Sequence, residues 1–123
     1  MTMENREEIM DIMRARHAVR AYQETPIEEA VVIRLHEEIE LCNKESGLHI
    51  QLVTQEPHAF GSFLTHYGLF SGVRNYMALV GTDDATMQEK AGYYGQRLVL
   101  DAQRLGLSSC WVAGTFSRKK TPV

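Results

Sequence analysis

Residues 76–112 read YMALVGTDDATMQEKAGYYGQRLVLDAQRLGLSSCWV, and this stretch decides the fold. It opens with the apolar run 76–80, which is typical of a strand covered on both faces. A long helix is expected over 83–105, because its apolar residues recur at helical spacing and Gly106 follows as a natural stop. A last short strand is expected over 108–112. The stretch therefore predicts a strand, a helix and a strand in succession.

Working outward from this unit, the preceding residues predict more helices and one more strand. Residues 25–28, TPIE, have the form of a helix start with a cap, a proline at the first helical position and a glutamate at the third. The apolar face behind them ends at Gly47. A first helix is expected over 5–14, a strand over 48–54, and a short helix or ordered loop over 55–72. The pattern predicts an α+β fold, a three-layer α/β/α sandwich with a small sheet.

Composition limits the class of protein. A chain of 123 residues with 44% hydrophobic residues can bury a core without disulfides, so we predict one domain over 1–123. No run approaches the ~20 apolar residues of a membrane span, and residues 1–16 lack the apolar stretch of a signal peptide. The expected location is cytoplasmic. The formal net charge of −3 disfavours nucleic acid as a partner, although a local basic patch could hold one small anion.

The two cysteines suit a reducing compartment. Cys42 and Cys110 belong to no C-x-x-C pair and have no spaced histidine, so both are expected to pack as small apolar side chains without a disulfide. His58 and His66 are interpreted as loop or surface residues, and no metal site is predicted.

Two glycines inside the long helix, Gly92 and Gly95, need a reason, because each costs up to ~1 kcal/mol relative to alanine. One interpretation is that another backbone approaches this helix closely, such as that of a partner subunit. The other is a frayed first turn, with the helix starting near Tyr93. The sequence alone leaves both open.

The cationic residues gather in residues 14–20, which read RARHAVR. A phosphate needs several convergent donors, and the planar guanidinium of arginine matches phosphate oxygens. Alternatively, these cations only favour the negative end of the helix before them. No Rossmann fingerprint, P-loop, nucleophile elbow or H-E-x-x-H helix is present.

Three blocks of the chain resemble the FMN-dependent nitroreductase family. Residues 16–22, RHAVRAY, resemble its Arg-x-Ser-x-Arg/Lys-x-Phe/Tyr signature, and residues 70–81, FSGVRNYMALVG, look like its strand entry. The most specific block spans residues 89–116 and contains the Leu-Gly-Leu stop and the Cys-Trp-Val segment of one branch. Because the chain ends at Val123, the resemblance implies the N-terminal part of the family fold without its C-terminal portion.

The resemblance implies a homodimer that holds FMN at the subunit interface. In that picture Arg16, His17 and Arg20 cradle the phosphate and ribityl chain, and Ala18 stands where the family usually has serine. Residues 113–114 match the segment that passes the flavin ring through its backbone; the implied cofactor-binding residues are thus Arg16, His17, Ala18, Arg20, Ala113 and Gly114.

The activity implied by the resemblance is hydride transfer from NADH or NADPH through FMN to a nitro compound, a quinone or a similar small-molecule acceptor. The cofactor performs the chemistry, so no catalytic side chain is predicted. Two alternatives stay open: a non-catalytic or truncated nitroreductase-like interaction domain, and an anion- or nucleotide-binding regulator that uses residues 14–20.

Overall fold

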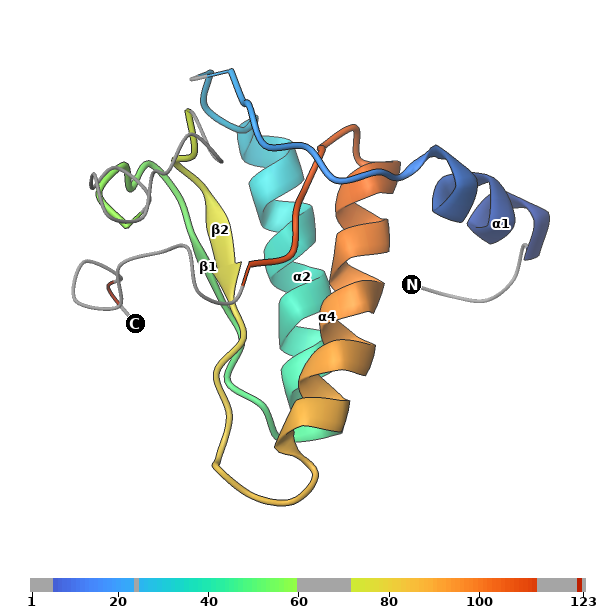
Figure 1. The fold of residues 1–123 in the computed structure, drawn as a ribbon, viewed down its shortest axis with the longest axis vertical. Helices are drawn as coiled ribbons and strands as arrows, with labels where there is room; N and C mark the ends of the chain where they lie inside the picture. Colours follow the sequence, from blue (N-terminus) through green and yellow to red (C-terminus); the bar gives the residue numbers. More distant parts are fainter. Residues whose placement is uncertain (1–5, 24, 60–71, 113–121, 123) are drawn as a thin grey trace.

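Two long helices and a small sheet form the body of the protein, with a third helix at one side (Figure 1). The structure is a computed structural model, and it describes residues 6–23, 25–59, 72–112 and 122. The elements follow in the order α1 (Arg6–Ala15), α2 (Glu29–Ser46), β1 (Gln51–Val53), β2 (Tyr76–Ala78) and α4 (Met87–Arg104). The α+β class predicted from the sequence is confirmed.

The sheet pairs β1 with β2 in antiparallel register, with Leu52 opposite Met77. The pairing continues past the regular ladder, since the His49 amide donates to the Val80 carbonyl at 2.7 Å and the Glu56 amide to the Arg74 carbonyl at 2.8 Å. Both strands thus lie where the sequence predicted them, although their regular parts are shorter.

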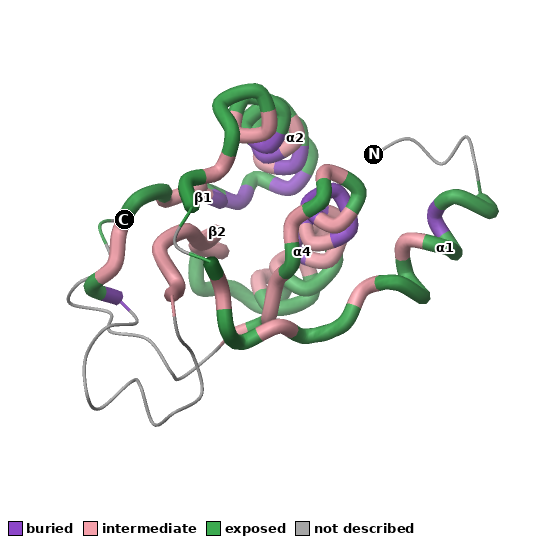
Figure 2. Tube along the Cα trace, turned by 90° about the horizontal axis from the view of Figure 1, so that it is seen from above, coloured by how far each residue is buried: buried purple, intermediate pink, exposed green. Residues whose placement is uncertain are grey.

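The core lies between this sheet and the two long helices. Figure 2 shows that α2 and α4 turn their buried residues inward. Each fully buried leucine stabilises the fold by about 1.5–3 kcal/mol. The buried cluster at this interface consists of Ile39, Cys42, Leu48, Ile50 and Leu98.

Both cysteines are free, as predicted: Cys42 is buried in the core and Cys110 is half-buried. Burial raises the pKa of the Cys42 thiol, which keeps it in the unreactive protonated form. No helix in the described ranges is both long and apolar enough to span a bilayer.

The glycine stops and the start of α1 at Arg6 were predicted correctly, but α2 and α4 begin later than expected. Gly47 follows α2 in the left-handed conformation, with φ 78°, and its amide donates to the Asn43 carbonyl. However, α2 begins at Glu29 instead of Pro26. Glu28 keeps an extended backbone, with ψ 141°, and its carbonyl accepts the amides of residues 31 and 32. The backbone therefore begins the helix without the predicted side-chain cap.

The predicted strand over 108–112 is also wrong. This segment is extended, but its ladder consists of a single parallel bridge between Ser109 and Ala18. Figure 1 shows the N-terminal segment, in blue, crossing the segment that leaves α4. Beyond the bridge, the Trp111 side chain bonds to α4, which directs the segment toward the helix.

The extent of α4 excludes one of the two interpretations of its glycines, the frayed first turn. Because α4 begins at Met87, Gly92 and Gly95 do not lie in a frayed turn. Gly95 is buried, and a Cβ there would lie 2.5 Å from Cη2 of Trp111 and 2.9 Å from Cδ1 of Leu79. A close approach thus occurs at Gly95, but it is made by side chains of the same chain and not by the backbone that the first interpretation expected. Gly92 has open space around it.

The turn that follows β1 is organised by the carboxylate of Glu56. This carboxylate accepts hydrogen bonds from the amides of His58 and Ala59, at 2.8 and 3.0 Å, and from the Tyr76 hydroxyl at 2.9 Å. Burial acts to raise the pKa of Glu56, but these three donors outweigh it and hold that pKa below its usual range. Most of the loop expected over 55–72 lies outside the described residues.

A pH dependence of stability follows from Glu56. Its folded-state pKa is lowered, so its contribution is present above the unfolded value of about 4.5 and is lost as the pH falls through the folded pKa. We expect Glu56→Gln to cost about 1 kcal/mol at pH 7 and to flatten the loss of stability below pH 4.5. Urea titrations at several pH values would measure this. Parallel wild-type and variant profiles would contradict it.

Candidate functional site

The basic segment predicted to bind a phosphate leaves α1 in an extended conformation. The Arg16 amide continues the last turn of α1 by donating to the Ile12 carbonyl at 3.0 Å. The Val19 amide then donates to the Ser109 carbonyl at 3.1 Å, beside the parallel bridge of Ala18. Residues 16–20 are therefore fixed at both ends, once to a helix and once to the segment that follows α4.

Tyr22 and Gly72 hold the far end of this segment. The Tyr22 hydroxyl donates to the Val19 carbonyl, three residues earlier in the chain. Gly72 has φ 72°, and a Cβ there would lie 3.0 Å from the Tyr22 carbonyl carbon and still closer to its oxygen. Only glycine allows this backbone contact, so Gly72 belongs to the support of the basic segment.

Two arginines of the segment act on the ionisation of Tyr22. Burial, and secondarily the Cys110 thiol, raise the pKa of Tyr22 to about 12, while Arg16 and Arg20 act in the opposite direction. The phenol therefore stays protonated and neutral at physiological pH. Arg16 and Arg20, four residues apart in the chain, thus both favour the ionised form of this phenol through their positive charge.

Arg16 has an unused donor in this segment. Its Nε is buried and has no hydrogen-bond partner within the described part of the chain. A buried donor left without an acceptor costs about 1–3 kcal/mol. An anion that reaches the guanidinium would remove that cost, so Arg16 is the residue best prepared to accept one.

The remaining predicted site residues divide into two groups. His17, Ala18 and Arg20 lie on the same short segment as Arg16 and are exposed, and Nδ1 of His17 lies 3.2 Å from the Ala15 carbonyl oxygen. Ala113 and Gly114 lie outside the described residues. The structure thus places four of the six candidates together.

Arg14 differs from its basic neighbours. It is the basic residue of the last turn of α1, and its Nη1 lies 3.4 Å from Oδ1 of Asp11. The alternative interpretation, of a cation near the negative end of a helix, fits Arg14. It also applies to Arg16, whose amide continues the last turn of α1, but not to Arg20, which follows the helix end by five residues.

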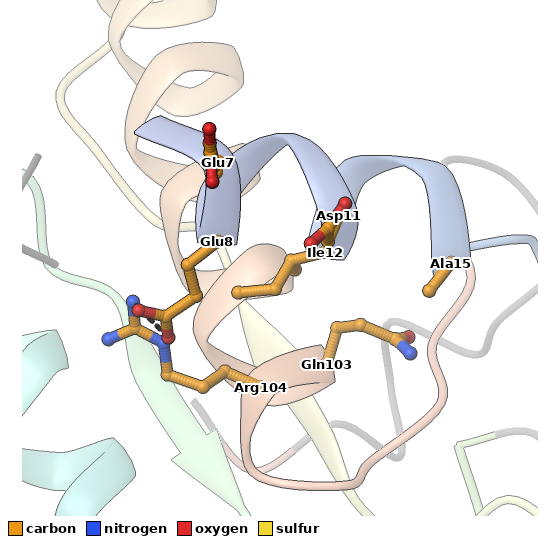
Figure 3. Close-up of a pocket in the computed structure, with 7 residues that line it drawn as sticks. All are labelled: Glu7, Glu8, Asp11, Ile12, Ala15, Gln103 and Arg104. Atoms are coloured by element: carbon orange, nitrogen blue, oxygen red, sulfur yellow. Dashed lines mark ion pairs between the residues drawn. The ribbon is translucent and has the colours of Figure 1, made fainter. Parts of the chain in front are cut away.

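The larger cavity in the described residues lies elsewhere, between α1 and α4. It has a volume of ≈510 Å³, and Figure 3 shows Glu8 reaching Arg104, with which it forms an ion pair at 3.0 Å. Glu7 points away from Arg104 in the same view. Because three carboxylates and one arginine line this cavity, it repels a phosphate. Its lining residues are Glu7, Glu8, Asp11, Ile12, Ala15, Gln103 and Arg104.

A second cavity, of ≈350 Å³, lies between α2 and α4. Its wall includes the carboxyl of Asp101, which is 5% exposed, and that of Glu38. Burial raises the pKa of Asp101 above its usual range, and Glu38 adds to the increase. Neither cavity includes the basic segment. Within the described ranges, no cluster of three or more His, Cys, Asp or Glu could hold a metal ion.

Sequence reasoning missed the residues that support the segment from elsewhere in the chain. Ser109 and Gly72 hold it through their backbones, and neither has a side chain whose chemistry would mark it. Tyr22 was part of the recognised signature, but its contact with the Val19 carbonyl is visible only in the fold. The signal available from sequence was the glycine at position 72, which is compatible with a positive φ.

The protein is thus an α+β domain that carries a basic segment, residues 16–20, between α1 and α2. The family described as "Putative TM nitroreductase" matches residues 8–123, so the chain belongs to that nitroreductase family. Family membership indicates an oxidoreductase. No curated protein and no solved structure shows significant similarity to the chain.

Proposed function

We propose that this protein is an FMN-dependent oxidoreductase that passes a hydride from NADH or NADPH through the flavin to a nitro compound, a quinone or a similar acceptor. Membership of the nitroreductase family supports the reaction class. The observation that carries the cofactor proposal is the buried Nε of Arg16, which has no acceptor among the described residues.

The residues present fit the phosphate end of FMN. Arg16 and Arg20 carry two permanent positive charges on one short segment, and both act electrostatically on the Tyr22 phenol. No carboxylate has a hydrogen bond or ion pair to Arg16 or Arg20 among the contacts of the described residues. A dianionic phosphate supplies acceptors for several guanidinium donors at once, which an uncharged ligand does not.

The chain would act by binding and orienting. When bound, FMN supplies the hydride chemistry itself. Arg16 and Arg20 would hold the phosphate, and His17 would contact the neighbouring polar chain of the cofactor. Ala18 offers only backbone groups, and its bridge to Ser109 keeps that backbone extended. The bridge and the Tyr22 hydrogen bond order the segment before binding, so less conformational entropy is lost on binding.

We also propose a homodimer with the flavin site at its interface. Neither of the two cavities described above is lined by Arg16, His17 or Arg20, so the flavin site would need further walls. Large apolar side chains remain exposed on α2 and α4, among them Ile33 and Tyr93, which are 53% and 61% exposed. A partner subunit would cover such side chains.

The proposal is tested by FMN binding to Arg16→Gln. We expect its dissociation constant for FMN to rise about tenfold or more, since a hydrogen bond to a charged group contributes about 1.5–3 kcal/mol. Quenching of flavin fluorescence measures the constant, and NAD(P)H oxidation with a nitroaromatic acceptor measures the activity. Arg14→Gln is the matched control, because it removes the same charge from an exposed residue that pairs with Asp11.

Equal loss of affinity in the two variants would mean that only overall charge matters. A wild-type protein that retains no flavin after incubation with FMN and desalting would refute the cofactor proposal. It would favour a non-catalytic nitroreductase-like interaction domain. Tighter binding of ATP or inorganic phosphate than of FMN would instead indicate an anion-binding regulator.

A further inference from the structure

The indole of Trp111 is held against α4 by two neighbouring residues. Its Nε1 donates to Oε1 of Gln96 at 2.9 Å. Its ring lies where the side chain of Gly95 would be, since a Cβ there would lie 2.5 Å from Cη2 and 3.2 Å from Cζ2 of the indole. Trp111 is nevertheless 44% exposed, so its position depends on these contacts more than on enclosure in the core.

The fixed indole lies close in the chain to the residue that holds the basic segment. Ser109 is two residues before Trp111, and two residues span at most about 7 Å. The Ser109 carbonyl accepts the Val19 amide at 3.1 Å, beside the bridge with Ala18. A continuous set of contacts thus leads from α4 through Trp111 and Ser109 to the segment of Arg16 and Arg20.

The residue between them packs against another part of the chain, since Cys110 contacts the cluster around the buried Ala59. On the other side of the bridge, the Tyr22 hydroxyl donates to the carbonyl of Val19, and the Val19 amide donates to Ser109. Residues 109–111 therefore contact the basic segment through the Ser109 backbone and α4 through the Trp111 side chain. Their only regular pairing among the described residues is the single bridge at Ser109, so side-chain contacts, on α4 and around Ala59, also hold them in position.

We propose that Gln96 and Gly95 are positioning residues for the basic segment, and that they act through Trp111 and residues 109–110. Neither touches the proposed phosphate site. Gln96 fixes the rotation of the indole, and Gly95 provides the space in which it lies. The consequence for FMN binding rests on the function proposed above, whereas the ordering of the basic segment does not.

The first test measures the segment without any ligand. Trp111 is the only tryptophan, so its emission reports its environment directly. In Gln96→Leu we expect a red-shifted emission that acrylamide quenches more easily. We also expect exchange of the Val19 amide to accelerate about threefold to tenfold, as for the loss of one hydrogen bond. Gln96→Glu keeps an acceptor for the indole N–H and should restore both values.

Matched variants separate this effect from a general loss of stability. Gln88→Leu makes the same change at an exposed position of the same helix and should change neither readout. Trp111→Phe removes the indole N–H while leaving Gln96 in place, and it should accelerate Val19 exchange as Gln96→Leu does. This second variant decides the question if Gln96→Leu does not fold.

The second test compares FMN with riboflavin, which has no phosphate. If Gln96 positions the arginines, Gln96→Leu should raise the dissociation constant for FMN about threefold to tenfold and leave that for riboflavin unchanged. A variant that is only less stable would weaken both ligands together, which would overturn the inference.

Unchanged Val19 exchange in both Gln96→Leu and Trp111→Phe would also overturn it, even if the emission shifts. If the wild-type protein shows no preference for FMN over riboflavin, the proposed phosphate site fails. The exchange of the Val19 amide still decides whether α4 positions the segment.

Discussion

Gly72→Ala is expected to lower the free energy of unfolding by about 3 kcal/mol. Two costs add at this position. Its φ of 72° lies in the left-handed region, which costs a residue with a Cβ about 1–2 kcal/mol. The Cβ would also meet the Tyr22 carbonyl, and relieving such an overlap costs typically ~1–3 kcal/mol. Urea denaturation at constant m-value would measure the loss.

Gly106→Ala is the matched control for this substitution. Gly106 also has a positive φ, 86°, but a Cβ there would meet no atom within 4 Å. The free energy of unfolding of Gly106→Ala should therefore fall by the cost of the backbone conformation alone, about 1–2 kcal/mol. Equal losses in the two variants would mean that the contact between residues 72 and 22 relaxes freely. The difference between them measures how firmly the end of the basic segment is held.

The second large effect is a difference of about 1–3 kcal/mol between alanine at Gly92 and alanine at Gly95, because the propensity gain is common to both and only Gly95 carries the overlap. Both lie inside α4, where replacing glycine gains up to ~1 kcal/mol of helix propensity. At Gly92 the space is open, so Gly92→Ala should raise the thermal midpoint. At Gly95 the added Cβ would overlap the Trp111 ring and Leu79, so Gly95→Ala should lower it.

Thermal unfolding at two protein concentrations tests both substitutions. If Gly95→Ala is as stable as the wild type, the Trp111 ring moves away at little cost, and its emission should then shift. If Gly92→Ala is less stable than the wild type at high protein concentration but not at low concentration, Gly92 lies in a subunit interface, because the substitution then weakens association and not the monomer. That result would support the proposed homodimer and contradict the expected stabilisation.

Much of the fold could be predicted because its signals are local. The stripe of apolar residues along α4 recurs at helical spacing, and the left-handed glycines 47 and 106 follow the ends of α2 and α4. The cationic residues of the proposed site are consecutive in the chain, so their clustering was visible without a structure. The start of α2 was misplaced because Glu28 caps the helix with its backbone carbonyl, which has no residue-specific signature.

The sequence by itself determined the α+β class, the order of the elements, the family and the position of the basic segment. These depend on periodicity, turn residues and short motifs, which are properties of neighbouring residues. Only the tertiary structure decided that Tyr22 meets Gly72, that Trp111 lies on Gly95, and that 108–112 forms one bridge in place of a strand. It also showed that the Nε of Arg16 is buried without an acceptor among the described residues. Such features depend on which distant segments pack together, and no local pattern specifies that.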